Sequence, residues 1–229
     1  MNIAIIPARG GSTRIPRKNI KTFCGKPMLA WSIEAAQKSR CIDLIVVSTD
    51  DDEIAAVARN YGAIVPFMRP AELADNYTGT TAVICHAMQW LQAADYKLKN
   101  ICCIYATAPL IQPADLQKSF DQLNASNSAF VFSATSFPFP IQRAIRKTEN
   151  GGCTPMFPEY IGKRSQDLQE AFHDAGQFYW GRADSWMKGI SVFSEASEMY
   201  PLPRWRVQDI DTLEDWDRAE RLFTAFYSS

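Results

Sequence analysis

Four cationic side chains are concentrated in a short glycine-bearing segment near the amino terminus. An apolar run, Ile3 to Ile6, leads directly into this segment, whose two adjacent glycines permit a sharp turn with backbone amides close to a ligand. Guanidinium and ammonium groups on such a turn suit a ligand that carries several phosphates. The segment therefore predicts a polyphosphate site at the end of a strand. Its residues are Ala8, Arg9, Gly10, Gly11, Ser12, Thr13, Arg14, Ile15, Pro16, Arg17, Lys18 and Asn19.

Two common phosphate-binding motifs do not fit this segment. The P-loop requires Gly-Lys followed by Ser or Thr, but Gly25-Lys26 precedes Pro27. The dinucleotide fingerprint requires three spaced glycines, and only the adjacent pair Gly10-Gly11 is present. A solvated basic turn without a ligand is the remaining alternative.

Two aspartates near the carboxyl terminus, Asp209 and Asp211, form the second chemical signal. On an extended strand end, residues two apart point to the same side, so both carboxylates would offer oxygen ligands to one cation. Mg²⁺ is the expected ion, because proteins usually hold it with one or two carboxylates and with substrate phosphates. Capping of a helix at Thr212 explains one acidic residue but not two. Together with the basic turn, the pair predicts a metal-nucleotide site.

The composition is that of one enzyme-sized domain whose positive charge is local. Of 229 residues, 47% are apolar, and the formal net charge is -1. Clustered cations in a near-neutral chain favour a small anionic ligand over nucleic acid or a membrane surface. Because residues 1–7 do not resemble a secretory signal and no apolar run could cross a bilayer, we expect a cytoplasmic protein. The six cysteines lack Cys-x-x-Cys spacing and are expected to be reduced, mostly buried thiols.

Alternating apolar runs and amphipathic segments predict an α/β fold with a three-layer, Rossmann-like, mostly parallel sheet. Right-handed crossovers would then gather the ligand-binding loops at the carboxyl ends of the strands. Acidic residues 50–52 are expected to cap the second helix, and Leu213, Trp216, Ala219, Leu222 and Phe223 to form the buried face of the last one. We expect strands at 3–7, 43–48, 63–67, 101–105 and 129–133, and helices at 27–39, 52–61, 80–94, 113–124 and 212–226.

Residues 137–180 interrupt this alternation with aromatic, proline and polar residues. They indicate an antiparallel excursion whose aromatic surface is too large for a monomer to cover, which predicts a small dimerisation arm and a homodimer. Alternation resumes near Val207. We therefore treat 1–229 as a single domain, with 137–180 as a dimerisation and substrate-covering excursion.

Several segments, taken in order, resemble the cytidylyltransferases that activate nine-carbon acidic sugars, the acylneuraminate cytidylyltransferase family. The match extends over nearly the whole chain and implies a nucleotide-diphosphosugar-transferase fold that forms a dimer. It also implies that CTP and a nine-carbon keto sugar acid yield a CMP-sugar and pyrophosphate. Four later segments, 142–144, 164–167, 173–181 and 208–212, are most similar to one subgroup of that family. The family segments are 8–19, 47–50, 69–73, 107–110 and 209–212.

The resemblance also implies roles for individual residues. Arg9 and Lys18, with Arg14 beside them, would hold the triphosphate and stabilise the departing pyrophosphate, and Asp209 and Asp211 would bind Mg²⁺. The other residues expected at the nucleotide are Ala8, Gly10, Gly11, Ser12, Thr13, Asn19, Arg69, Thr80, Tyr105 and Ala106.

Three positions depart from the relatives' pattern. Thr13 replaces a lysine of the sialate-activating relatives, and Arg14 is expected to supply that charge. Tyr105 replaces a glutamine that reads cytosine in some relatives, which leaves base recognition to nearby backbone groups. Gln142 aligns with a sugar-contacting lysine, so Arg143 is the expected partner of the substrate carboxylate.

The two histidines have different expected roles. His86 lies in the helical segment 80–94, where a buried or helix-face position is favoured over catalysis. His173 is followed by Asp174, and for this pair a contact with the sugar and a place at the subunit interface both remain open.

Two other classes of function are compatible with the motifs. One is a nucleotidyltransferase that makes a nucleoside-diphosphate sugar from a sugar 1-phosphate. The other is a nucleotide-binding protein without activity, which is disfavoured because mere binding does not require transition-state electrostatics.

Overall fold

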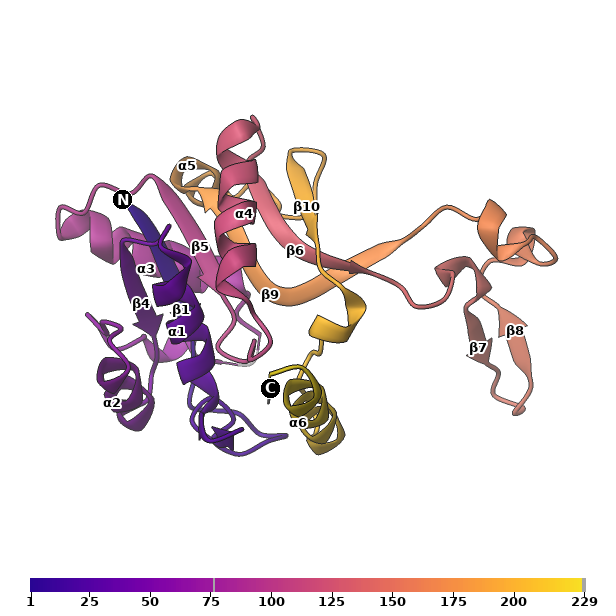
Figure 1. Ribbon diagram of the computed structural model, residues 1–229, viewed down its shortest axis with the longest axis horizontal. Helices are drawn as coiled ribbons and strands as arrows, with labels where there is room; N and C mark the ends of the chain where they lie inside the picture. Colours follow the sequence, from indigo (N-terminus) through magenta and orange to yellow (C-terminus); the bar gives the residue numbers. More distant parts are fainter. Residues whose placement is uncertain (76, 228–229) are drawn as a thin grey trace.

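A six-stranded mixed sheet forms the centre of the protein in a computed structural model that describes residues 1–75 and 77–227 (Figure 1). The strand order is β10-β6-β9-β5-β1-β4. Five of these strands run in one direction, and β9 runs antiparallel to both β5 and β6. The expected mostly parallel α/β sheet is confirmed. The strand bounds are β1 Asn2–Pro7, β4 Leu44–Ser48, β5 Asn100–Ile104, β6 Phe130–Ser136, β9 Phe172–Arg182 and β10 Ser197–Pro201.

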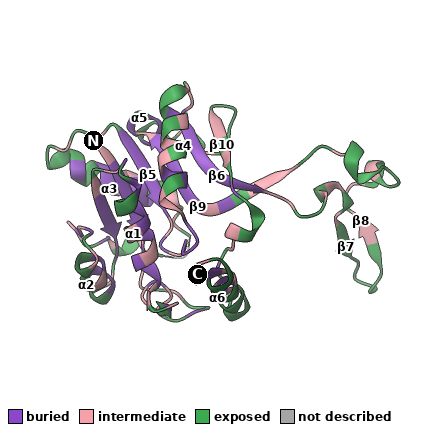
Figure 2. Ribbon diagram, viewed as in Figure 1, coloured by how far each residue is buried: buried purple, intermediate pink, exposed green. Residues whose placement is uncertain are grey.

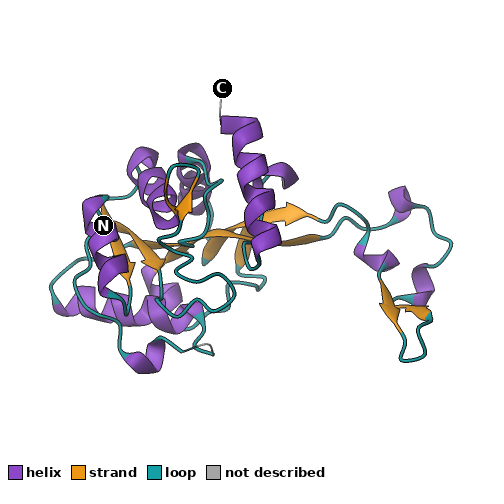
Figure 3. Ribbon diagram, turned by 90° about the horizontal axis from the view of Figure 1, so that it is seen from below, coloured by secondary structure: helices purple, strands orange, loops and turns teal. Residues whose placement is uncertain are grey.

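Helices cover both faces of this sheet, as the edge-on view in Figure 3 shows. Leu29 and Ile33 of α1 pack with Trp180 of β9 on one face, and Ile84 and Met88 of α3 pack on the other. Such double coverage explains why β1 and β5 are continuously apolar rather than alternating. The helices on the first face are α1 Met28–Ser39, α2 Asp52–Asn60 and α4 Pro113–Ala125; α3 Thr80–Ala93 and α5 Ala183–Met187 lie on the second.

The last helix, α6 Leu213–Tyr227, packs on the segment that follows the basic turn. The ring of Phe23 lies edge-on to Trp216 and Phe223, with centroids 5.3 and 5.7 Å apart. The expected buried face is correct for Trp216, Ala219 and Phe223, but Leu213 is 57% exposed because it starts the helix beyond this contact. This packing joins α6 to residues 15–28, which follow the basic turn. Two short strands, β2 Thr22–Phe23 and β3 Lys26–Pro27, form a hairpin within the contacted segment.

The expected strand at 63–67 is wrong. The structure shows only isolated bridges there, Val46 to Ile64 and Thr49 to Met68. Pro66 lies between them and has no amide hydrogen to donate to β4, so a continuous ladder does not form. The segment instead leads Arg69 towards the end of β4, where its amide bonds to the Thr49 carbonyl.

Residues 137–171 extend away from the sheet, and Figures 1 and 2 show them as a largely exposed projection. The projection carries a hairpin of β7 Ile145–Lys147 and β8 Cys153–Pro155, with short 3-10 turns around it. The remainder of the expected excursion, 172–180, lies in β9, where Phe178 and Trp180 are fully buried. The projecting arm is therefore shorter than the sequence predicts, because the aromatic run 178–180 fills the core.

No helix within the described ranges, 1–75 and 77–227, is long and apolar enough to span a bilayer. The six cysteines are free: Cys41, Cys102 and Cys103 are buried, and Cys153 on the arm is exposed.

Candidate active site

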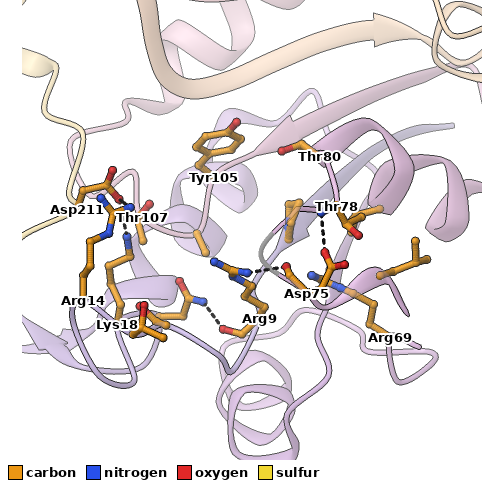
Figure 4. Close-up of a pocket in the computed structure, with 17 residues that line it drawn as sticks. Arg9, Arg14, Lys18, Arg69, Asp75, Thr78, Thr80, Tyr105, Thr107 and Asp211 are labelled. Carbon is orange, nitrogen blue, oxygen red and sulfur yellow. Dashed lines mark hydrogen bonds and ion pairs between the residues drawn. The ribbon is translucent and has the colours of Figure 1, made fainter. Parts of the chain in front are cut away.

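A cavity of about 320 Å³ opens at the carboxyl ends of β1 and β5 (Figure 4). Its wall comes from the basic turn after β1, from residues 105–107 after β5, from the start of α3 and from the segment before α6. This is the edge at which α/β sheets bind ligands, as the sequence predicts. The lining residues are Pro7, Arg9, Ser12, Thr13, Arg14, Lys18, Asn19, Arg69, Leu73, Asp75, Thr78, Thr80, Val83, Tyr105, Ala106, Thr107 and Asp211.

The basic turn and the carboxyl-terminal aspartates converge in this cavity. The Arg14 guanidinium lies 2.9 Å from Asp211 Oδ1, and Lys18 Nζ lies 3.4 Å from the same oxygen. Lys18 Nζ also donates to the Ile210 carbonyl at 2.5 Å. Figure 4 shows both long side chains extending towards Asp211. Residues 192 or more positions apart in the chain thus share one site.

Arg9 reaches the opposite side of the cavity. Its guanidinium donates to the Asp75 carbonyl at 2.6 Å, while the Asp75 carboxylate accepts from the amides of Tyr77 and Thr78 at 2.9 and 2.6 Å. Asn19, which is buried, donates its side-chain amide to the Arg9 carbonyl at 2.9 Å and so fixes the turn. Arg9 and Arg14 therefore approach the cavity from two sides, as Figure 4 shows.

The glycines of the turn have a different use from the expected one. Gly10 donates its amide to Asp50 Oδ1 at 2.9 Å instead of facing the cavity, and Ala8, Gly10 and Gly11 are absent from the cavity wall. A Cβ on Gly10 would lie 2.8 Å from Asp51 Oδ2. Glycine at this position lets the turn pack closely on Asp51 at the start of α2.

Arg17 faces away from the cavity. It forms a two-pronged ion pair with Asp51 and contacts Glu53 at 2.6 Å. The hydrogen bonds from Arg17 are the main cause that holds the pKa of Asp51 below its ordinary value, and Asp51 also caps α2 by accepting from the Ile54 amide. The sequence prediction of four phosphate-facing cations in the turn is thus wrong for Arg17, which instead fastens the turn to α2.

Arg69 adds a further cation to the cavity wall from another direction. It is buried, donates to Ser48 Oγ at 3.1 Å and also bonds to the Ser48 carbonyl. Burial lowers the pKa of its guanidinium. Thr80 lines the cavity at the first residue of α3, so the positive end of that helix lies beside it.

Asp209 and Asp211 lie on a segment without regular secondary structure, not on the expected strand end. Asp211 lines the first cavity, whereas Asp209 stands at the rim of a neighbouring cavity of about 780 Å³. Loss of surrounding water raises the pKa of Asp209, and the nearby Asp211 carboxylate adds to the effect. A divalent cation would relieve this mutual repulsion, so the donor pair fits Mg²⁺. Since residues 1–75 and 77–227 contain no cluster of three acidic, His or Cys ligands, water and substrate phosphates would complete the coordination.

The residues expected at the sugar separate into two groups. His173 and Asp174 line the neighbouring cavity, which shares Tyr105 with the first one. Asp174 accepts the Tyr179 hydroxyl at 2.6 Å, and the His173 ring contacts the backbone carbonyl of Asp174, not its carboxylate. The other group, Gln142 and Arg143, lies on the arm.

The side chains of Gln142 and Arg143 both donate to backbone carbonyls of the arm itself. Gln142 donates to the Gln169 carbonyl at 2.9 Å, and Arg143 donates to the Lys163 carbonyl at 2.8 Å. The structure therefore does not bring Gln142 or Arg143 together with the residues that line the first cavity.

Comparison with known proteins agrees with this geometry. The family model for cytidylyltransferases matches residues 3–149. The chain belongs to the cytidylyltransferase family. It is 43% identical to the pseudaminic acid cytidylyltransferase of Campylobacter jejuni serotype O:2, over 100% of this chain and 98% of that protein. It is 29% identical to the CMP-N,N'-diacetyllegionaminic acid synthase of Legionella pneumophila, over 96% and 95%.

The fold of this cytidylyltransferase is also that of a solved CMP:2-keto-3-deoxy-manno-octonic acid synthetase complexed with CTP. The two chains superpose with a TM-score of 0.72 over 98% of each, at 15% identity. The expected family and fold are thereby confirmed. The subgroup indicated by residues 142–144, 164–167, 173–181 and 208–212 is that of the pseudaminic acid enzymes.

Sequence reasoning missed several residues of this cytidylyltransferase's cavity. Asp75 and Thr78 enter it because Arg9 bonds to the loop that carries them, and no spacing in the sequence signals that contact. Thr107 belongs to a segment that the family resemblance contains, and it lines the cavity after β5. His86 lies on α3 against the Phe67 ring, 4.8 Å between centroids, as the helix-face prediction implies.

Proposed function

We propose that the protein transfers the CMP group of CTP to pseudaminic acid, giving CMP-pseudaminic acid and pyrophosphate. The observation that carries this proposal is the convergence of Arg14, Lys18 and Asp211 in one cavity at the carboxyl ends of the strands. Identity of 43–44% over the full chain to enzymes named for that reaction selects the substrate. Because the six cysteines are free thiols, as is usual in a reducing compartment, we also infer that the protein acts in the cytoplasm.

The reaction is an in-line displacement at phosphorus. The anomeric hydroxyl of the sugar acid attacks the α-phosphorus, the bond to the pyrophosphate oxygen breaks, and the hydroxyl proton leaves to solvent or to a phosphate oxygen. Arg9, Arg14 and Lys18 stabilise the negative charge that accumulates on the departing pyrophosphate. No side chain forms a covalent intermediate in this scheme.

Asp209 and Asp211 would hold Mg²⁺, which supplies positive charge at the phosphate oxygens and lowers the pKa of a bound hydroxyl. In the structure Asp211 is already paired with Arg14 and Lys18. The chain's own part in binding is therefore an exchange of partners, in which both cations turn from Asp211 to the triphosphate.

The two cavities divide the substrates between them. Arg69, Thr80 and the backbone at Tyr105 and Ala106 border the first cavity, where the nucleoside would lie. His173, Asp174 and Asp209 border the second, where the sugar acid would lie with its anomeric hydroxyl directed to the shared boundary at Tyr105.

A pyrophosphate-release assay with CTP and Mg²⁺ tests the proposal. The panel is pseudaminic, N-acetylneuraminic, legionaminic and eight-carbon keto acids, and pseudaminic acid is expected to have the highest kcat/KM. Highest turnover with legionaminic or neuraminic acid would replace the proposed substrate. Absence of pyrophosphate release with every acid would leave a nucleotide-binding protein and overturn the proposed reaction.

We further propose that the protein acts as a homodimer through its arm. Gln142 aligns with a sugar-contacting position, and the adjacent Arg143 is the expected partner of the substrate carboxylate. Both lie on a projection that extends away from the cavities of their own chain, so a second copy is needed to present them to a substrate. Ile145 and Ile161 on the arm are 65% and 62% exposed, and Phe139 is 78% exposed. Met156 on the same arm is 55% exposed, and large apolar side chains gathered on one small projection favour burial at a subunit contact.

Replacing both Ile145 and Ile161 by aspartate should convert the dimer to a monomer, because two charges would be buried in the contact. Size-exclusion chromatography with light scattering measures the mass. Phe226→Asp on α6 is the control, because it places the same charge at an exposed apolar residue outside the arm. A wild-type protein that is monomeric at working concentration would contradict the dimer.

A further inference from the structure

Asp215, in the first turn of α6, binds the segment that carries Asp209 and Asp211. Its Oδ2 accepts from the Thr212 amide at 2.8 Å, the Thr212 hydroxyl at 2.8 Å and the Asp211 amide at 3.2 Å. Its Oδ1 accepts from Gln208 Nε2 at 3.2 Å. One carboxylate thus contacts the chain on both sides of the aspartate pair.

Only some of these bonds belong to ordinary helix capping. In a capping box, the side chains of the first and fourth residues bond to each other's backbone amides, as Thr212 and Asp215 do here. The bonds to the Asp211 amide and to Gln208 exceed that motif. Gln208 Nε2 also donates to the Asp209 carbonyl at 2.8 Å. The Gln208 side chain therefore links Asp215 to the backbone of Asp209.

The segment requires such a support because no strand ladder holds residues 207–211. Its centre is fixed by Ile210, which is fully buried, and by the bond from Lys18 to the Ile210 carbonyl. Upstream, Arg206 is fixed by its ion pair with buried Asp115. Gln208 and Thr212, which stand on either side of the two aspartates, are held by hydrogen bonds to Asp215.

We propose that Asp215 is a positioning residue that sets the separation and direction of the Asp209 and Asp211 carboxylates, without itself binding the cation. Both Asp215 oxygens already accept hydrogen bonds from this segment. Asp215 is therefore not a third ligand of the cation. The inference rests on the proposed function, in which the aspartate pair and CTP bind Mg²⁺ together. Residues that orient metal ligands typically change metal affinity by about 10- to 100-fold when replaced.

The test is CTP binding measured by calorimetry in EDTA and in saturating Mg²⁺, without sugar acid, so that no turnover is needed. The ratio of the two Kd values is the Mg²⁺-dependent gain in affinity. Asp215→Ala removes every bond, and Asp215→Asn can keep an oxygen towards Thr212 while losing the acceptor for Gln208. Thr212→Ala is the matched control, because it removes the hydroxyl of the helix cap but leaves Asp215 bonded to Gln208 and to the Asp211 amide. Glu214→Gln controls for loss of charge in the same turn, since Glu214 is exposed.

Asp215→Ala should reduce the Mg²⁺-dependent gain by about tenfold, and Asp215→Asn by a smaller factor, with CTP affinity in EDTA not weakened. The Mg²⁺ concentration for half-maximal pyrophosphate release should rise in parallel, while excess Mg²⁺ restores most of kcat. Thr212→Ala should lower Tm and keep the wild-type gain. Equal losses of gain in Thr212→Ala and Asp215→Asn, or an unchanged gain in both Asp215 variants, would reduce Asp215 to a helix cap and overturn the proposal. Failure of the wild-type protein to release pyrophosphate with any acid would instead reject the proposed function.

Discussion

Replacement of Asp211 by asparagine should lower the rate of pyrophosphate release by about 10²- to 10³-fold at saturating substrates, the range seen when one preorganised charge-stabilising group is lost. The substitution keeps the shape of the side chain and removes one of the two carboxylates that fit Mg²⁺. The fold should persist, because Asp211 is partly exposed and its backbone is held by Ile210 and Asp215. Circular dichroism and Tm check that expectation.

The same variant should bind metal-free CTP more tightly than the wild-type protein. In the structure Arg14 and Lys18 are paired with Asp211, and the triphosphate must compete with that carboxylate for both cations. The Arg14 side chain is 65% exposed, so solvent screening limits the gain to roughly two- to fivefold. Tighter binding combined with lost turnover is an outcome that general damage to the site does not produce.

Calorimetry in EDTA measures this effect, and Asp217→Asn, an equal charge change at an exposed position of α6, is the control. If Asp211→Asn and Asp217→Asn bind CTP alike, the ion pairs of Asp211 do not compete with the triphosphate. Near-normal pyrophosphate release by Asp211→Asn would remove Asp211 from the metal site.

Local signals explain which elements the sequence predicts well. The strands β1, β4 and β5 are short apolar runs between polar loops, and their buried side chains are contiguous in sequence. The start of α2 is predicted because Asp51 provides its cap from within four residues. Such features need no knowledge of distant contacts.

Non-local pairing explains most of what the sequence does not predict. β9 is inserted between β5 and β6, so Cys102 and Val131 both pair with Trp180, and no local pattern encodes that choice. From the sequence alone, the aromatic run 178–180 predicts an exposed surface, but in the structure it fills the core. The sequence does not predict β10, because Ser197–Pro201 has neither an apolar run nor a clear alternation and gains its strand conformation by pairing with β6.

The candidate site shows the same division. The two motifs that converge are recognisable because each has a chemical pattern of its own, a row of cations and a pair of aspartates. The direction of each side chain is not recognisable, since Arg17 and Arg14 stand three residues apart and face α2 and the cavity respectively. Arg17 has a φ of 57°, and this left-handed conformation, which the sequence does not signal for an arginine, belongs to the turn that directs it to Asp51.

Gly181→Ala should destabilise the protein by about 3 kcal/mol, the upper part of the range for overpacking a core. A Cβ at this position of β9 would lie 2.5 Å from the Phe130 ring and from Trp186 Nε1. Neither ring can withdraw easily, because they pack edge-on at 4.9 Å and Trp186 donates to the Ile101 carbonyl. Gly181 pairs with Ile101 and Phe130 in the two neighbouring strands, so a shift of β9 would disturb both ladders.

Urea unfolding measures the loss, with Gly11→Ala as the control, since no atom lies within 4 Å of a Cβ there. The loss of stability should appear as a lower urea midpoint at unchanged slope, which identifies a weakened native state. Because β9 leads from the arm into the sheet and carries Asp174, which lines the second cavity, this variant should also loosen the wall of that cavity. A midpoint equal to that of Gly11→Ala would mean that the Phe130 and Trp186 rings yield to a Cβ at position 181, and the expected overpacking would be rejected.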